Sequence, residues 1–86
     1  MSKLYVLTDH VKQRIAERDI KIEWVEKAVF NPDRLEISKK APDSQLEALA
    51  IIPEFGNRVL RVIYDHTGAI PVIITVYFDR KMKGKL

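Results

Sequence analysis

The chain has 86 residues and a formal net charge of +3, with 47% hydrophobic and 31% charged residues. This length and composition predict one small folded domain over residues 1–86 and exclude an intrinsically disordered chain. The absence of cysteine excludes disulfides, thiolate metal sites and thiol chemistry. Because the two histidines, His10 and His66, are far apart in sequence, we expect no metal site.

Signals for membranes, export and nucleotide cofactors are absent from the sequence. The longest apolar run, residues 69–78, is too short to cross a bilayer, and the N-terminus carries no secretion signal. The three glycines are isolated, so there is no glycine-rich loop to hold the phosphates of a cofactor. We therefore expect a cytoplasmic protein with no cofactor and no membrane contact.

The positive charge is concentrated in a basic C-terminal tail, residues 79–86. This tail holds four basic residues against Asp79, a net charge of +3, so residues 1–78 sum to zero. The body is therefore not a general basic nucleic-acid binder. We expect the tail to be mobile and to contact RNA phosphates without reading sequence, through Arg80, Lys81, Lys83 and Lys85.

Two helices are predicted in the first third of the chain, after an extended segment at residues 4–7. Thr8 and Asp9 are good N-cap residues, and the apolar spacing behind them predicts a helix over residues 9–18. Asp19 tolerates the left-handed conformation that often closes a helix. A second apolar stripe predicts a helix over residues 22–30, ended by Asn31-Pro32 and carrying Trp24 on its buried side.

Beyond Pro32 the apolar pattern has a period of two, which is typical of strands. Short turns between the strands indicate an antiparallel meander. The sequence therefore predicts an α+β domain, with both helices packed on one face of a three- or four-stranded antiparallel sheet. Apolar alternation begins at Leu35 and Ile37; a polar loop is expected at residues 39–44, and the main strands at residues 45–52, 58–64 and 72–78.

Alternation along the strands sorts their side chains into two faces. One face is almost wholly apolar and is expected beneath the helices; in the last strand it comprises Val72, Ile74, Val76 and Phe78. The other face is mixed, and two interpretations of it remain open. Arg61 and Glu47 form an ordinary cross-strand ion pair, or the face binds a phosphodiester or a second copy of the chain. This mixed face consists of Gln45, Glu47, Leu49, Ile51, Val59, Arg61, Ile63, Ile73, Thr75 and Tyr77.

Three side chains form a stripe along the first helix. His10, Arg14 and Arg18 are spaced four residues apart, which places them on one side of the helix. His10 lies in the first turn, where the helix dipole disfavours a protonated imidazole and thus suits a general base. In the simpler interpretation, His10 caps or packs and both arginines are solvated.

The helix motif and the later strands together resemble a known family. Thr8, His10, Arg14, Arg18 and Ile20, followed by Asn31-Pro32, are similar to the motif of domain-of-unknown-function family 4258. The strand beginning Arg58-Val59-Leu60-Arg61-Val62 and the strand around Thr75 also look like that family, and the resemblance covers residues 7–78.

That family looks like a member of the RelE-type toxin and ribonuclease fold group, which implies metal-independent cleavage of RNA. The resemblance implies His10 as base or acid, and Arg14 and Arg61 as groups that stabilise the phosphate. It implies Tyr77 or Thr75 as an orienting donor. RNA and an antitoxin-type protein are then the expected partners, and Arg18 joins the tail in binding RNA.

Three hypotheses follow. The first is a toxin-like, metal-independent endoribonuclease with a RelE-like fold. The second is a small non-catalytic module that binds RNA or a protein through the sheet face and the basic tail. The third is a homodimer joined through the sheet. A single catalytic site also faces a geometric difficulty, because the His10 stripe and the face carrying Arg61 and Tyr77 point in different directions.

Overall fold

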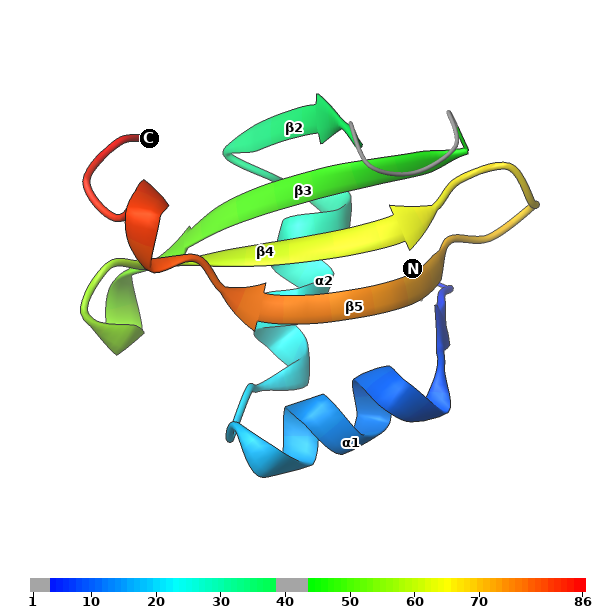
Figure 1. Cartoon of the computed structure of the whole chain (residues 1–86), viewed down its shortest axis with the longest axis horizontal. Helices are drawn as coiled ribbons and strands as arrows, with labels where there is room; N and C mark the ends of the chain where they lie inside the picture. Colours follow the sequence, from blue (N-terminus) through cyan, green and yellow to red (C-terminus); the bar gives the residue numbers. More distant parts are fainter. Residues whose placement is uncertain (1–3, 39–43) are drawn as a thin grey trace.

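The computed structural model describes residues 4–38 and 44–86, which form two helices and one five-stranded sheet (Figure 1). The strands lie in the order β1-β5-β4-β3-β2, and α2 passes behind the sheet in Figure 1. The elements are β1 (Val6–Leu7), α1 (Asp9–Glu17), α2 (Ile22–Phe30), β2 (Arg34–Ile37), β3 (Gln45–Ile52), β4 (Arg58–Asp65) and β5 (Val72–Phe78), with short 3-10 turns η1 (Pro53–Phe55) and η2 (Arg80–Met82).

The predicted α+β class is confirmed. The sheet, however, has five strands instead of the predicted three or four, and it is not purely antiparallel. The extended segment near the N-terminus forms β1, which pairs in parallel with β5. The backbone N–H of Val6 donates to the carbonyl of Pro71 at 2.9 Å, and that of Thr8 donates to the carbonyl of Ile73 at 3.4 Å. A two-residue strand has no alternating pattern of its own, so the sequence could not indicate its partner.

Both helices form where their caps and apolar stripes predict them. The hydroxyl of Thr8 accepts from the backbone N–H of Val11 at 3.3 Å, so it caps α1. Asp19 has a φ of 52°, the left-handed conformation expected after this helix. In α2, the predicted buried position of Trp24 is confirmed.

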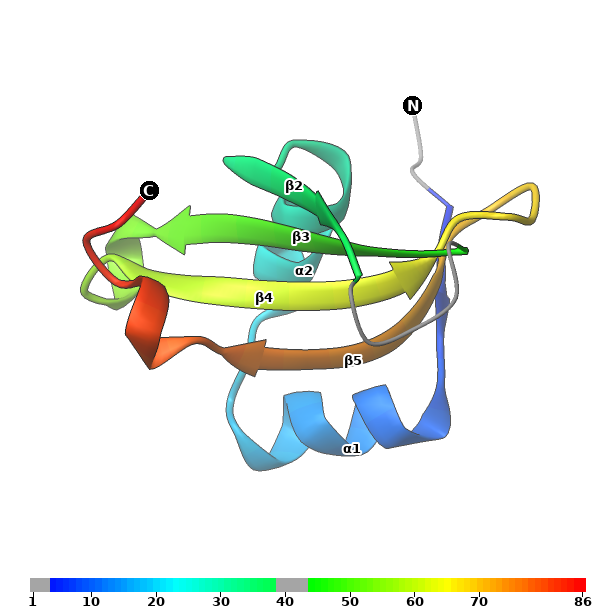
Figure 2. The same cartoon turned by 45° about the horizontal axis from the view of Figure 1, so that its top comes forward.

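One apolar core lies between the helices and a single face of the sheet. Figure 2 shows α1 running alongside β5 while α2 crosses β3 and β4, and these are the strands that each helix packs against. Buried side chains from α1, α2, β3, β4 and β5 meet in this layer. They include Val11, Val25, Ala28, Ala48, Ala50, Ile52, Leu60, Val62 and Val76.

A β-bulge changes which side chains of β5 enter the core. Thr75 pairs with Ile63, but the next residue along β4, Tyr64, pairs with Ile73, so Ile74 is the extra residue. Ile73 is consequently buried in the core, and its predicted position on the mixed face is wrong. Because of the same shift, Val72 pairs with Asp65 on the side of the sheet away from the helices, whereas alternation predicts Val72 on the helix-facing side.

The C-terminal segment folds back on the sheet face opposite the helices, which we call the open face. The backbone N–H of Asp79 donates to the carbonyl of Val59 at 2.8 Å, and η2 packs against β4. Val59 and Leu49 are fully buried although they lie on this face. Within the predicted tail, Arg80–Met82 form the 3-10 turn η2. The predicted polar loop falls almost wholly on residues 39–43, outside the described residues.

Candidate functional site

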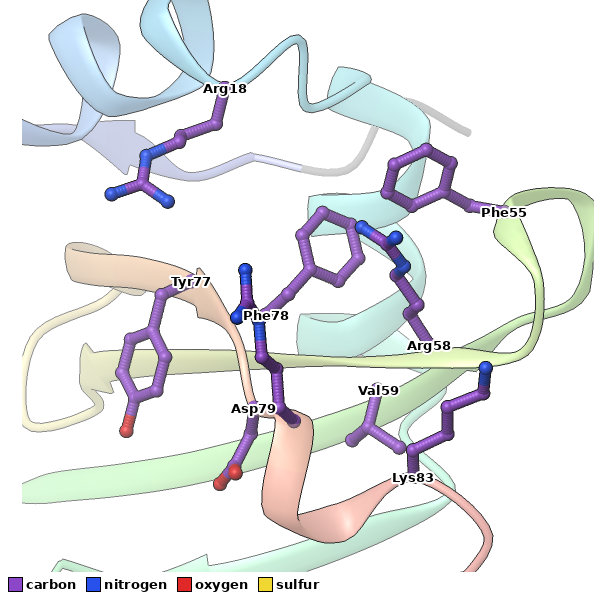
Figure 3. Close-up of a pocket in the computed structure, with 9 residues that line it drawn as sticks. Arg18, Phe55, Arg58, Val59, Tyr77, Phe78, Asp79 and Lys83 are labelled. Carbon is purple, nitrogen blue, oxygen red and sulfur yellow. The ribbon is translucent and has the colours of Figure 1, made fainter.

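A pocket of about 420 Å³ lies at the end of the sheet where β4 begins and β5 ends (Figure 3). Its walls come from the end of α1, the turn before β4, the last residues of β5 and the C-terminal segment. The short turns and η2 bring these distant parts of the sequence together. The lining residues are Arg18, Phe55, Arg58, Val59, Tyr77, Phe78, Asp79, Arg80 and Lys83.

Four cationic side chains line this pocket, each placed by a different local feature. Arg18 is the C-cap of α1, and Arg58 is the first residue of β4. Arg80 begins η2, and Lys83 is its C-cap. In Figure 3 the side chain of Arg18 descends from the helix toward Tyr77, and that of Arg58 rises from β4. We call this pocket the cationic pocket, after Arg18, Arg58, Arg80 and Lys83 in its walls.

Among the described residues that line the cationic pocket, Asp79 alone is acidic, and it is paired with a neighbouring arginine. One of its oxygens, Oδ2, accepts from Arg61 Nε at 2.9 Å and lies 2.8 Å from Arg61 Nη2. Its other oxygen accepts from the backbone N–H of Lys81 at 3.1 Å, which caps η2. Asp79 therefore shapes the C-terminal wall, and the four cations that line the pocket outnumber this one carboxylate.

Arg61 also binds two carboxylates from neighbouring strands. Its Nη1 donates to Glu47 on β3 and lies 3.5 Å from a carboxylate oxygen of Glu36 on β2. Burial lowers the pKa of Arg61, but hydrogen bonds to Asp79 and Glu47 outweigh that effect and raise the pKa above its ordinary value. The predicted cross-strand pair with Glu47 is present, and Arg61 would have to leave these carboxylates before it could contact a phosphate.

Aromatic rings form the other walls of the cationic pocket. The ring of Phe55 stacks on buried Trp24 with centroids 5.4 Å apart, and it contacts Phe78 at 5.1 Å. The guanidinium carbon of Arg58 lies 4.5 Å from the centroid of Phe55, a cation–π contact. Tyr77 remains 42% exposed, and partial burial raises the pKa of its hydroxyl although the charge of Arg61 opposes the shift.

His10 and Arg14 line a different, shallower groove of about 230 Å³ on α1, together with Gln13 and Glu17. Thr8 fixes this end of α1 beside Ile73, whereas Arg18 reaches the pocket at the far end of β5. Eight helical residues separate His10 from Arg18, a rise of about 12 Å. The predicted catalytic residues are thus distributed over two surfaces.

The model of the family described as Domain of unknown function (DUF4258) matches residues 7–78. The chain belongs to the DUF4258 family. The comparisons with curated proteins and with solved structures returned no match. The matched range runs from β1 through β5, so Arg18 and Arg58 lie inside the DUF4258 region whereas Arg80 and Lys83 follow it.

The structure of this DUF4258 chain brings together some of the predicted site residues and separates others. Tyr77, Arg18, Arg80 and Lys83 meet in the cationic pocket. Thr75 lies on the open face opposite Ile63, while Lys81 and Lys85 are exposed and do not line the pocket.

Sequence reasoning missed Phe55 and Arg58, which line the pocket on either side of a tight turn. The signal that could have indicated them is an aromatic residue followed three positions later by an arginine, within a turn that contains glycine. Within residues 4–38 and 44–86, no group of three His, Asp or Glu side chains could hold a metal ion. None of the helices in the same residues is long and apolar enough to span a membrane.

Proposed function

We propose that this DUF4258 protein binds RNA through the cationic pocket. The observation that carries the proposal is the convergence of four cations in one pocket whose single lining carboxylate is already paired with Arg61. Residues 1–78 carry no net charge, and the fold places Arg18 and Arg58 of this neutral body beside Arg80 and Lys83 of the basic tail. Arginine and lysine side chains are the groups that most often contact nucleic-acid phosphates.

Several cations favour a polyanion over a ligand with one phosphate group. Exposed Lys81 and Lys85 extend the positive charge of the pocket along the C-terminal segment. A chain of phosphates can contact such a series of cations, and each neutralised phosphate releases bound counterions. RNA binding is also the role that the second sequence hypothesis assigns to the basic tail.

Charge removal in the pocket is expected to weaken RNA binding. We expect the double variant Arg18→Gln/Arg58→Gln to bind a fluorescein-labelled oligoribonucleotide about tenfold or more weakly, because two phosphate contacts are lost. The slope of log affinity against log salt should also fall by about two. Fluorescence anisotropy titrations between about 50 and 200 mM salt measure both quantities.

The matched control is Lys12→Gln/Arg34→Gln, which removes the same charge from exposed positions outside the pocket. This control should bind RNA as the unmodified protein does, apart from a small general electrostatic loss. Equal weakening in both double variants would contradict a localised site, and no binding by the unmodified protein would remove the proposed function.

RNA cleavage is the second candidate, favoured by the shared groove of His10 and Arg14. Exposed His10 would take the proton of a ribose 2′-hydroxyl, whose oxygen attacks the adjacent phosphorus. The bond to the 5′-oxygen breaks and that oxygen takes up a proton, which leaves a 2′,3′-cyclic phosphate and a 5′-hydroxyl end. Arg14 would stabilise the negative charge of the transition state. The resemblance to RelE-type ribonucleases supports this role.

Replacing His10 tests cleavage separately from binding. We expect His10→Ala to lose at least about a hundredfold in cleavage rate, because general acid–base catalysis contributes that much. Its RNA affinity should be unchanged, since His10 lies outside the cationic pocket. Gel analysis of labelled RNA gives the rate, with His66→Ala as the control. Cleavage that persists in His10→Ala, or is absent from the unmodified protein, would contradict the second candidate.

A further inference from the structure

The ring of Tyr77 has the exposure and the surroundings of a stacking platform. Tyr77 lies on the open face at the end of β5, directly opposite Arg61 of β4. It is 42% exposed, whereas the neighbouring ring of Phe78 is only partly exposed and contacts the core. A ring of this size left in water at the wall of a pocket offers a flat apolar surface to a ligand.

The positions of the cations relative to Tyr77 add the second feature of a nucleotide site. In Figure 3 the guanidinium of Arg18 lies beyond the backbone end of the Tyr77 side chain, and the hydroxyl of Tyr77 points away from it. Arg18 and Arg80 line the same pocket as the ring. A base stacked on Tyr77 would therefore place its own phosphate near these cations, while the tyrosine hydroxyl would remain outside the contact.

We propose that the cationic pocket accepts an unpaired nucleotide of single-stranded RNA, whose base stacks on Tyr77 and whose phosphate contacts Arg18 and Arg80. This inference rests on the proposed RNA binding and names the form of RNA that the pocket takes. In an A-form duplex the base faces are covered by their neighbours, so a stacking platform can be used only by an unstacked base. Stacking on an aromatic ring tolerates any base, so little sequence preference is expected.

The role assigned here to Tyr77 differs from that of an orienting donor, because stacking needs the ring and a donor needs the hydroxyl. Tyr77→Phe keeps the ring and removes the hydroxyl, whereas Tyr77→Leu removes the ring. Tyr77 is exposed, so both variants should unfold at nearly the same temperature as the unmodified protein.

The test uses anisotropy titrations with three probes of equal length: a single-stranded oligoribonucleotide, its blunt duplex, and a single strand with abasic sites. We expect the unmodified protein and Tyr77→Phe to bind the single strand equally well. Tyr77→Leu should bind it about 5- to 100-fold more weakly, and the abasic strand should show a similar loss with the unmodified protein.

Three results would overturn this inference while leaving RNA binding intact. They are equal affinity of the unmodified protein for duplex and single strand, unchanged affinity in Tyr77→Leu, and a loss in Tyr77→Phe as large as that in Tyr77→Leu. Failure of the proposed function itself is distinguished from these results, because the unmodified protein would then bind none of the three probes.

Discussion

Replacing Arg61 with methionine is expected to lower the free energy of unfolding by about 3 kcal/mol, because it leaves partly buried carboxylates without their counter-charge. The side chain of Arg61 is only 12% exposed, and its guanidinium joins Glu36, Glu47 and Asp79 from three segments of the chain. Glu36 and Glu47 pair directly across β2 and β3, so once Arg61 is removed their repulsion is offset only in part, by Arg34 beside Glu36. Urea unfolding followed by circular dichroism measures the loss.

A second arginine of the same network provides a comparison for Arg61→Met. Arg34→Met provides the control: Arg34 is more exposed and lies 3.0 Å from Glu36, so its loss should cost less than about 1 kcal/mol. Equal losses in the two variants would contradict a special role for the buried guanidinium of Arg61.

Trp24→Ala is expected to lower the free energy of unfolding by about 3–5 kcal/mol, the range for deleting a large buried aromatic side chain. Trp24 is 6% exposed, stacks on Phe55 and meets the edge of Phe78 with centroids 6.0 Å apart. Truncation leaves a cavity behind two walls of the cationic pocket. Because Trp24 is the only tryptophan, unfolding should be followed by circular dichroism instead of fluorescence.

Trp24→Phe separates packing from hydrogen bonding at this position. Within the described residues, the indole N–H of Trp24 is buried and has no hydrogen-bond partner. Removing an unpaired donor offsets part of the lost contact area, so Trp24→Phe should cost clearly less than Trp24→Ala. A phenylalanine variant as unstable as the alanine variant would mean that the indole N–H has a partner in solution.

The helices and the three long strands could be predicted because their signals are local. Thr8 caps α1 and Pro32 follows α2, and each of these signals depends on residues within one or two turns of the boundary. Strand alternation likewise predicted the open face with Arg61 and Tyr77. The position of Ile73 could not be predicted, because the bulge at Ile74 is visible only once β4 and β5 are paired.

The candidate site could be predicted only in part, because it depends on contacts between distant segments. His10, Arg14 and Arg18 follow one another along α1, but His10 and Arg14 line the shallow groove whereas Arg18 lines the cationic pocket. The C-terminal cations were predicted to bind phosphate, yet nothing local indicated that Asp79 would join Arg61 and fold the tail onto β4. Long-range ion pairs of this kind appear only when the strand order is known.

Mapping of RNA contacts on the ¹⁵N-labelled protein tests directly whether RNA binds at the cationic pocket. Backbone amide signals are followed by two-dimensional NMR while a short single-stranded oligoribonucleotide is added. If RNA binds in the cationic pocket, the largest shifts should occur at the segments that form it: Arg18, the turn from Phe55 to Arg58, and Tyr77 to Lys83. Shifts confined to the groove of His10 and Arg14, or no shifts at all, would contradict it.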